Sequence, residues 1–363
     1  MRLYTLFIIA AAAIIPVLST PTYNCGCTKP LIRKEWRTLD TKEKHEYIDA
    51  VKCLASKSSQ TGNVYEGAKS RFDDFQATHI VNTDSIHYVV RFLSTVSVTL
   101  YGIACSLPSM RRIFEISVAI RAHSLIGVHW ALDSSSIEDF CSSPIFDKET
   151  GFGGNGMFIN TTGWTNITRE VPGRTGGGCV INGPFVKGEF TVHMGPGNSS
   201  AYNPRCLSRD IAPEFAISKL NQCFIDWTLE AEDFYEFDKR VQGGITTTTQ
   251  GYHGGGHLGI GGNTGELSDI YSSPGDPLFF MHHTNIDRLW DQWQRLDWPF
   301  RRTDISGPDT QYAYPFNFFG DRSYKNITIN YKMNFSNLIP GRQYVTVKDV
   351  VDTQGGQLCY VYK

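Results

Sequence analysis

The sequence predicts a mainly α-helical fold, and two stretches carry helical patterns of their own. In residues 276–287, an aspartate and a proline precede an apolar run that continues to Leu289 and Trp293. Aspartate favours the position before a helix, and proline suits the first helical position. Residues 43–54 form the second stretch, where apolar residues recur at helical spacing: Tyr47, Ile48, Val51 and Leu54.

Residues 1–20 have the features of a secretory signal peptide. Arg2 precedes an apolar run from Leu6 to Val17, which is too short to span a bilayer. We therefore expect a secreted, extracellular protein made of residues 21–363, with no membrane partner. Five Asn-X-Ser/Thr sequences agree with this route and predict glycosylation: Asn160, Asn166, Asn198, Asn326 and Asn334.

Composition narrows the class of protein further. Hydrophobic residues make up 41% of the chain and aromatic residues 13%, which supports a large core, and no linker or repeat divides residues 21–363. The net charge of −2 gives no bias toward polyanions, so a nucleic-acid partner is not expected. Nine cysteines in an exported chain predict disulfides, with one cysteine left over.

The remaining segments are assigned in order. Residues 151–206 are rich in Gly, Asn, Thr and Pro and predict loops and short strands. Residues 211–237 have helical character. Near the end, Val345 and Val347 alternate with polar residues, which favours a short strand.

Histidines at ligand spacing are the main chemical signal. His253 and His257 lie four residues apart, so one helical face can present both to a metal, and the three glycines between them are expected to leave the space over the metal free of side chains. His283 lies on the predicted buried helix, with Asp287 one turn later on the same face. Such a pair is either a structural hydrogen bond or a metal ligand with the residue that orients it.

These motifs together resemble the second copper site of the tyrosinase / polyphenol oxidase (type-3 copper) family. The resemblance implies that His253, His257 and His283 hold one copper, with Asp287 behind them. Residues 75–79 and 85–87 resemble the start of the first copper site, so His79 and His87 are its expected ligands. The implied fold is a mainly α tyrosinase-like domain with a central four-helix bundle, long loops and a few short strands.

The resemblance also implies a reaction. Two copper ions and O2 would oxidise a small phenol or catechol to an o-quinone. Gly254 and Leu258 follow the second-site histidines, and Ile270 falls at the position of the gate residue, so the substrate mouth offers no polar group to deprotonate a monophenol. We therefore expect diphenol oxidation to be favoured. The ending, residues 359–363, resembles the tyrosine motif that closes the catalytic domain, so no C-terminal shielding domain is expected.

One feature departs from the family pattern. The third ligand of the first site should fall in a Trp-His-Arg at position 96, where this chain has valine. The codons behind residues 101–106, shifted by two bases, permit Trp-His-Arg, and the same shift over residues 117–126 permits the family sequence that follows it. Our hypothesis is that roughly residues 95–129 are an intron-retention or frameshift artefact, which makes Cys105 spurious. His123 or His129 replacing the lost ligand is the alternative.

Three functions therefore compete. The first is a dicopper phenol oxidase, although the literal chain is expected to be weakly active or inactive. The second is a haemocyanin-type oxygen carrier, which shares the six-histidine site but forms no quinone. The third is a mononuclear metal-binding or structural protein. All versions of the oxidase require the two histidine groups to converge, and a separation on the order of 15 Å or more would exclude a shared dinuclear centre.

Overall fold

The computed structural model describes residues 27–88 and 127–363, apart from residues 166, 168, 169, 336, 337, 339–342, 356 and 357. The fold is mainly helical with a few short strands, as predicted. The longest helices are α1 (Thr41–Ser56), α2 (Arg71–Ile86) and α10 (Leu278–Leu296), and α9 (Tyr252–Gly261) packs beside α10. The shorter helices are α5 (Ile137–Cys141), α6 (Pro213–Lys219), α7 (Gln222–Leu229), α8 (Phe234–Gln242) and α11 (Trp298–Arg301).

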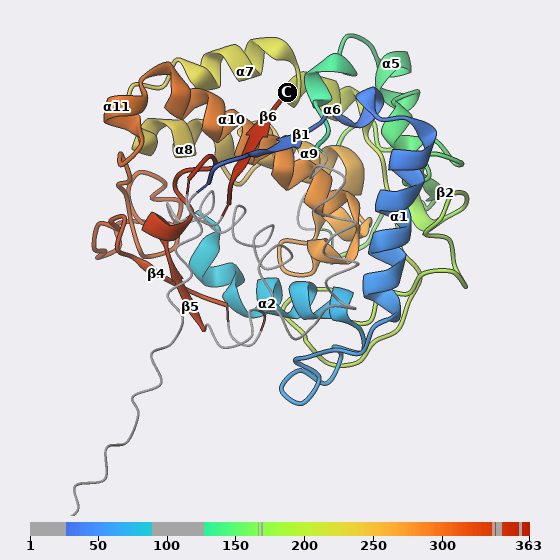
Figure 1. The fold of residues 1–363 in the computed structure, drawn as a ribbon. Helices are drawn as coiled ribbons and strands as arrows, with labels where there is room; N and C mark the ends of the chain where they lie inside the picture. The colour runs from blue at the N-terminus through green and yellow to red at the C-terminus, as the bar shows by residue number, and fades with distance from the viewer. Residues whose placement is uncertain are drawn as a thin grey trace, which may run out of the picture.

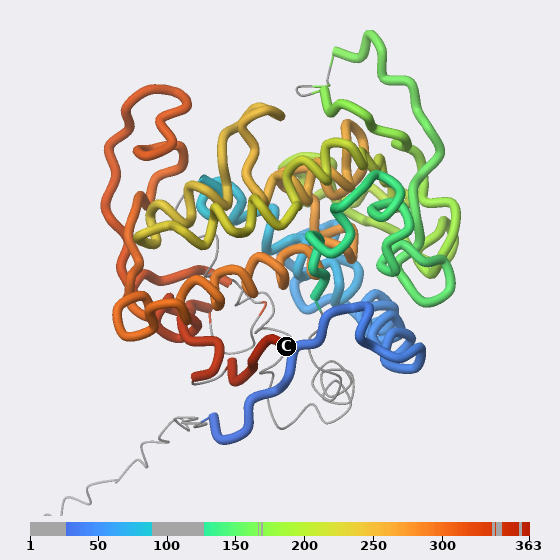
Figure 2. The backbone as a smooth tube through the Cα atoms, turned by 90° about the horizontal axis from the view of Figure 1, so that it is seen from above, coloured from blue at the N-terminus to red at the C-terminus, as the bar shows by residue number. Residues whose placement is uncertain are grey.

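The strands form three two-stranded sheets at the edges of the helical body. β1 (Leu31–Arg33) pairs in parallel with β6 (Tyr360–Tyr362), so the first and last described segments lie side by side (Figure 1). β2 (Gly156–Phe158) pairs with β3 (Gly177–Val180), and β4 (Lys332–Asn334) pairs with β5 (Tyr344–Thr346). The view from above shows β1 and the C-terminus meeting beside α10 (Figure 2).

The two predicted helices are confirmed, and their ends follow from local chemistry. At α1, Asp40 and Glu43 form a capping box in which each side chain accepts a hydrogen bond from the other residue's N–H. At α10, the helix begins at Leu278, one residue later than expected. The Asp276 carboxylate still accepts a hydrogen bond from the Leu278 N–H at 3.0 Å, so its capping contact is retained.

Helix α10 lies at the centre of the core. Leu289, Trp290 and Trp293 are fully buried on it, and the Trp293 ring stacks on Phe237 of α8 with 5.1 Å between centroids. Burial on nearly every face fixes the direction of each α10 side chain. The position of a histidine on this helix is therefore determined by the core.

Other segments differ in detail from the predictions. Residues 211–237 form α6, α7 and the start of α8 with turns between them. Val345 lies in β5, but Val347 begins a 3-10 turn, Val347–Asp349. Residues 151–206 are mostly loop with the short strands β2 and β3, as expected. The predicted signal peptide, residues 1–20, and most of the suspected artefact, residues 95–129, lie outside the described residues.

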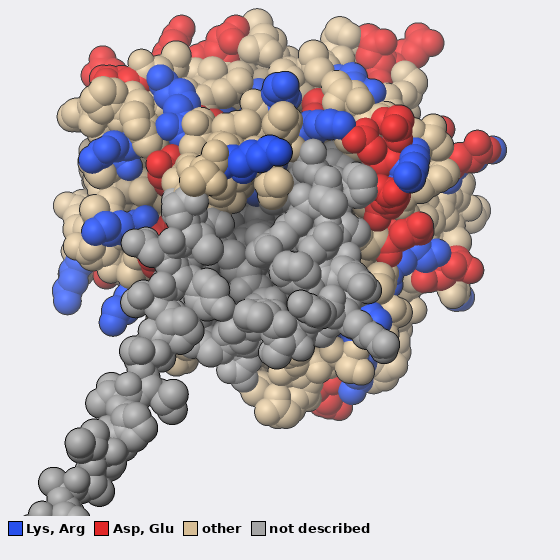
Figure 3. All heavy atoms as spheres, viewed as in Figure 1, with Lys and Arg blue, Asp and Glu red and all other residues tan. Residues whose placement is uncertain are grey.

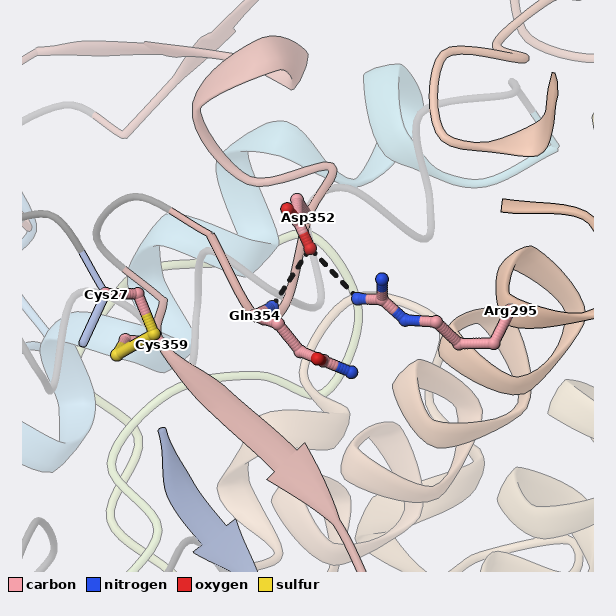
Figure 4. Close-up of a disulfide and its surroundings, with 5 residues drawn as sticks. All are labelled: Cys27, Arg295, Asp352, Gln354 and Cys359. Atoms are coloured by element: carbon pink, nitrogen blue, oxygen red, sulfur yellow. Dashed lines mark hydrogen bonds and ion pairs between the residues drawn. A yellow bond between two sulfur atoms is a disulfide. The ribbon is translucent and has the colours of Figure 1, made fainter. Parts of the chain in front are cut away.

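Two disulfides join described cysteines, Cys27–Cys359 and Cys179–Cys206, while Cys53, Cys141 and Cys223 carry free thiols. Figure 4 shows the first of these at the base of β6, near the turn in which Asp352 accepts hydrogen bonds from the Gln354 N–H and the Arg295 guanidinium. This disulfide fastens the ends of β1 and β6 to each other.

The surface carries both signs of charge in a mixed pattern. On the face in Figure 3, acidic and basic side chains alternate over the described residues without a large patch of one sign. Within the described part of the chain, none of the helices has the length and apolar character needed to span a membrane.

Candidate metal centre

Five histidines from three helices meet in the interior. His79 lies on α2 and His87 ends it, His253 and His257 lie on α9, and His283 lies on α10. The rings of His79 and His87 are 5.1 Å apart between centroids, and the ring of His87 stacks on that of His253 at 6.0 Å. The two predicted histidine groups therefore converge, and the separation that would exclude a shared centre is not seen.

The α9 and α10 histidines are closer still. The Nε2 atoms of His257 and His283 are 3.1 Å apart. The His253 ring lies 4.5 Å from that of His257 and 5.2 Å from that of His283. His253 and His257 are one helical turn apart on α9, so the spacing in the sequence brings them to one face.

Backbone carbonyls set the orientation of three of these rings. The Nδ1 atom of His79 bonds the Tyr271 carbonyl at 2.6 Å, that of His257 bonds the Leu267 carbonyl at 2.7 Å, and that of His87 bonds the Thr83 carbonyl at 3.2 Å. A carbonyl can only accept, so Nδ1 carries the proton in each ring. The Nε2 atoms are left with a lone pair, which is the form of imidazole that binds a metal.

All five imidazoles are neutral at ordinary pH. Burial lowers the pKa of His79 to about 3 and that of His87 to about 4. Burial, reinforced by the neighbouring histidines, holds the pKa of His253, His257 and His283 well below the usual value. A charged form would have to lose its solvation in this interior.

A sixth histidine, His282, lies beside the group. One ring nitrogen from each of His253, His257 and His282 lies within 4.8 Å of the other two, so these three could hold a metal ion. Both nitrogens of His282 are already used, because Nδ1 accepts from the Trp130 indole N–H at 3.2 Å and Nε2 donates to the His253 carbonyl at 2.8 Å. His282 therefore braces α9 against α10, and His283 is the better candidate ligand.

The glycines of α9 serve close packing, which corrects the expectation that they open a space over the metal. A Cβ on Gly256 would lie 2.2 Å from the His282 ring, and one on Gly255 would lie 2.5 Å from the Lys219 side chain of α6. A Cβ on Gly254 would meet the Gln250 amide at 1.6 Å. The missing side chains let α6 and α10 approach α9 closely.

The other predicted residues lie in different surroundings. Asp287 accepts hydrogen bonds from Arg33, Tyr360 and Tyr362, so it joins α10 to β1 and β6, and its role behind His283 stays a prediction. Leu258 is buried in a small apolar cluster with Phe215. Ile270 is partly exposed in the turn before Tyr271, and its role as a gate residue stays a prediction.

Three positions were considered for the third ligand of the first site, and the structure describes one of them, His129. Position 96 and His123 lie outside the described residues. His129 lines a separate cavity with Arg288 and Tyr362, so it does not replace the lost ligand. His282 and its partner Trp130 were not among the predicted site residues, although the adjacent histidines at 282 and 283 were a visible signal.

The donor set fits copper. The cluster offers neutral imidazoles, a ligand type that copper accepts well. The buried Nε2 atom of His79 has no hydrogen-bond partner among the described residues, and a buried polar atom of this kind is costly unless something binds it. The Phe279 ring stacks on His283 at 3.9 Å and touches His79 edge-on, which excludes water from one side.

Comparisons with known proteins agree with this geometry. The sequence matches the family model described as "Common central domain of tyrosinase" over residues 129–296, a range that contains His253, His257 and His283. N-acetyl-6-hydroxytryptophan oxidase ivoB of Emericella nidulans is 31% identical over 391 aligned residues, which cover 98% of each chain. Tyrosinase P of Aspergillus terreus is 29% identical over 360 residues, 93% of each chain.

A solved structure supports the same conclusion. A mutant polyphenol oxidase from Thermothelomyces thermophila superposes with a TM-score of 0.75 and 28% sequence identity, covering 92% of this chain and 89% of that chain. Identity above 30% along almost the whole length of ivoB, together with the shared fold, establishes the family. The chain belongs to the tyrosinase / polyphenol oxidase family of type-3 copper proteins.

Proposed function

We propose that this protein is a copper-dependent oxidase that uses O2 to convert phenols or catechols to o-quinones. The observation that supports the proposal most directly is the meeting of five neutral, buried imidazoles from α2, α9 and α10. His253, His257 and His283 would hold one copper, and His79 and His87 would hold the second. When bound, the copper pair would supply O2 binding and the acceptance of electrons from the phenol.

The chain's own residues prepare this site. The carbonyls of Tyr271 and Leu267 keep the protons of His79 and His257 on Nδ1, so no proton has to leave these rings before a metal binds. Phe279 closes one side against water. Trp130 and the His253 carbonyl hold His282 away from the metal by occupying both of its nitrogens.

The substrate class follows from the family and from the residues near the expected mouth. The names of two relatives refer to a tyrosinase and to an oxidase of a hydroxylated indole, both of which act on a hydroxyl-bearing ring. Ile270, Gly254 and Leu258 bring no acid or base to a bound phenol. We therefore propose that catechols are oxidised faster than the corresponding monophenols.

Metal analysis and oxygen uptake test the proposal together. Protein expressed from a transcript that restores the third first-site histidine, once reconstituted with copper, should bind it, consume O2 with an added catechol and form the quinone. His283→Gln should abolish second-site copper, whereas His282→Gln should retain copper at lower stability. Copper binding without quinone formation would favour an oxygen carrier. Zinc, or a single metal without oxidase activity, would favour the mononuclear alternative.

The first site needs a separate test, because its third histidine is absent at position 96. We propose that the transcript, once resequenced, encodes Trp-His-Arg in place of part of residues 95–129. A transcript that encodes these residues as printed would refute this explanation. The chain as printed, which lacks this histidine, should hold copper mainly at the second site and show little activity.

Secretion is also part of the proposal. Residues 1–20 should be removed on export, and the five Asn-X-Ser/Thr sequences should be the sites of any glycan. N-terminal sequencing of the exported protein checks the first point. An intracellular protein that retains Met1 would contradict it.

A further inference from the structure

A single short segment, residues 266–272, orients one histidine from each half of the centre. It follows α9 and includes the 3-10 turn Glu266–Ser268. Its Leu267 carbonyl accepts the Nδ1 proton of His257, and its Tyr271 carbonyl accepts that of His79. We call residues 266–272 the strap, because it runs between a histidine of α9 and a histidine of α2.

One side chain of α2 holds both ends of the strap. The amide nitrogen of Gln76 donates to Oε1 of Glu266 at 3.2 Å and to the carbonyl of Ser272 at 2.8 Å. Both partners are acceptors, so the amide nitrogen and not the amide oxygen must face them. Gln76 is almost fully buried, at 1% exposure, and it lies nearly one turn before His79 on the same helix.

Further bonds fix each half of the strap. The Arg205 guanidinium donates to both oxygens of Glu266, at 2.8 and 2.6 Å. The Tyr271 hydroxyl donates to Asp84 of α2 at 2.8 Å. Space around the Gln76–Glu266 contact is tight, since a Cβ on Gly275 would lie 2.6 Å from the Gln76 amide nitrogen and 2.7 Å from Glu266.

We propose that Gln76 is a positioning residue for both copper sites, acting through the strap. The inference rests on the proposed copper centre. Among the described histidines Gln76 has no hydrogen-bond partner, yet it holds the segment whose carbonyls set the rings of His79 and His257. Copper affinity at the second site therefore depends on a side chain of the helix that carries the first site.

The size of the effect follows from known metal sites. Losing a group that orients a metal-bound histidine typically costs about 10–100-fold in metal affinity. Gln76→Met keeps the length of the side chain but removes both donors, so Glu266 and Ser272 lose their shared partner. Tyr271→Phe removes one hydroxyl and releases only the end of the strap that faces His79.

Competition for copper(I) between the protein and a chelator measures the effect. In a His79→Gln background, the copper that remains belongs to the second site. There, Gln76→Met should lower affinity about 10–100-fold. Gln222→Met is the matched control, because Gln222 makes a comparable amide contact with Asp226 on the exposed face of α7. This control should leave affinity unchanged. Wild-type affinity in a folded Gln76→Met protein would overturn the inference.

A second set of three variants covers the case in which Gln76→Met does not fold. In a His283→Gln background of the protein with the restored first-site histidine, Tyr271→Phe and Asp84→Ala should each weaken copper bound by His79. Asp84→Asn should restore it because its amide oxygen still accepts. Equal affinities in all three would overturn the inference.

A metal-free readout separates the strap from the copper proposal. In protein labelled with ¹⁵N-histidine, the Nδ1–H signals of His79 and His257 should both shift in Gln76→Met and neither should shift in Gln222→Met. Wild-type protein that binds no copper would refute the proposed function. Unshifted Nδ1–H signals in Gln76→Met would refute the positioning role of Gln76.

Discussion

The guanidinium of Arg33 donates a 3.0 Å hydrogen bond to the carboxylate of Asp287, although the two residues are 254 positions apart. Both side chains are almost inaccessible to water, at 1% and 0% exposure. The hydroxyl of Tyr360 donates to the same carboxylate oxygen at 2.7 Å, and the Tyr360 ring lies 3.2 Å below the guanidinium carbon. The charge pair therefore ties β1 and β6 to the helix that carries His283.

Breaking this pair should destabilise the whole domain. Arg33→Met leaves a buried carboxylate without its cation, and such a change typically costs about 3–5 kcal/mol. Denaturant unfolding of the metal-free protein measures the loss. Lys42→Met is the control, because Lys42 forms an exposed pair with Glu46 and its loss should cost under about 0.5 kcal/mol. Equal stabilities for the two variants would show that the Arg33–Asp287 pair is not a stabilising contact.

The two disulfides should differ in their contribution. Cys27 and Cys359 are separated by 332 positions, whereas Cys179 and Cys206 are separated by 27. A longer closed loop restricts the unfolded chain more, and this difference in loop length corresponds to roughly 2 kcal/mol. Replacing Cys27 and Cys359 by serine should therefore lower the free energy of unfolding more than replacing Cys179 and Cys206. The reverse order, measured by denaturant unfolding, would contradict this account.

Gly256→Ala should weaken the contact between α9 and α10. Alanine is the better helix former by about 1 kcal/mol, but here its Cβ would lie 2.2 Å from the His282 ring. Two hydrogen bonds hold that ring, so it cannot move aside freely. Overpacking of this kind costs about 1–3 kcal/mol, and we expect lower thermal stability and weaker copper binding.

Gly154→Ala provides the comparison for this change. The nearest atom to its Cβ would be a side-chain oxygen of Asn182 at an ordinary 3.5 Å. Thermal unfolding and copper titration should find it close to wild type. A Gly256→Ala protein that matches it in both measurements would show that the α9–α10 contact can relax.

Much of the site could be predicted from the sequence, because its signals are local. The spacing of His253 and His257 on one helix and the apolar helix around His283 both depend on residues a few positions apart. The convergence of α2 with these helices came from the family resemblance. Periodicity alone gives no information about which helices meet.

The parts that were missed depend on distant contacts. Gln76 and Ser272 are 196 positions apart, and no local pattern marks either residue as a partner of the other. The glycines between His253 and His257 were expected to open a space, but their role depends on Lys219 and His282, which face them from other helices. Asp287 showed the right spacing to His283, yet the described partners of its carboxylate come from β1 and β6.

The buried carboxyl of Asp238 should make stability depend on pH. This side chain on α8 is fully buried, Oδ2 accepts from the Gln242 amide at 2.7 Å, and Oδ1 has no hydrogen-bond partner among the described residues. Burial raises the pKa of Asp238 to about 8 from an ordinary value near 3.8. Between these values the folded protein keeps a proton that the unfolded chain has released, so stability falls as pH rises.

Asp238→Asn tests this dependence, because the amide has the same shape and carries no charge. The free energy of unfolding of the wild type, relative to this variant, should fall by at most about 1.4 kcal/mol per pH unit between about pH 5 and pH 8. Asp139→Asn is the contrasting control, since hydrogen bonds from Ser135 and Ser136 lower the pKa of Asp139. Its effect should therefore appear only in more acidic solution. If the difference between wild type and Asp238→Asn stayed flat from about pH 5 to pH 8, the Asp238 carboxyl would have to be ionised in the folded protein, with a counter-charge or water reaching Oδ1.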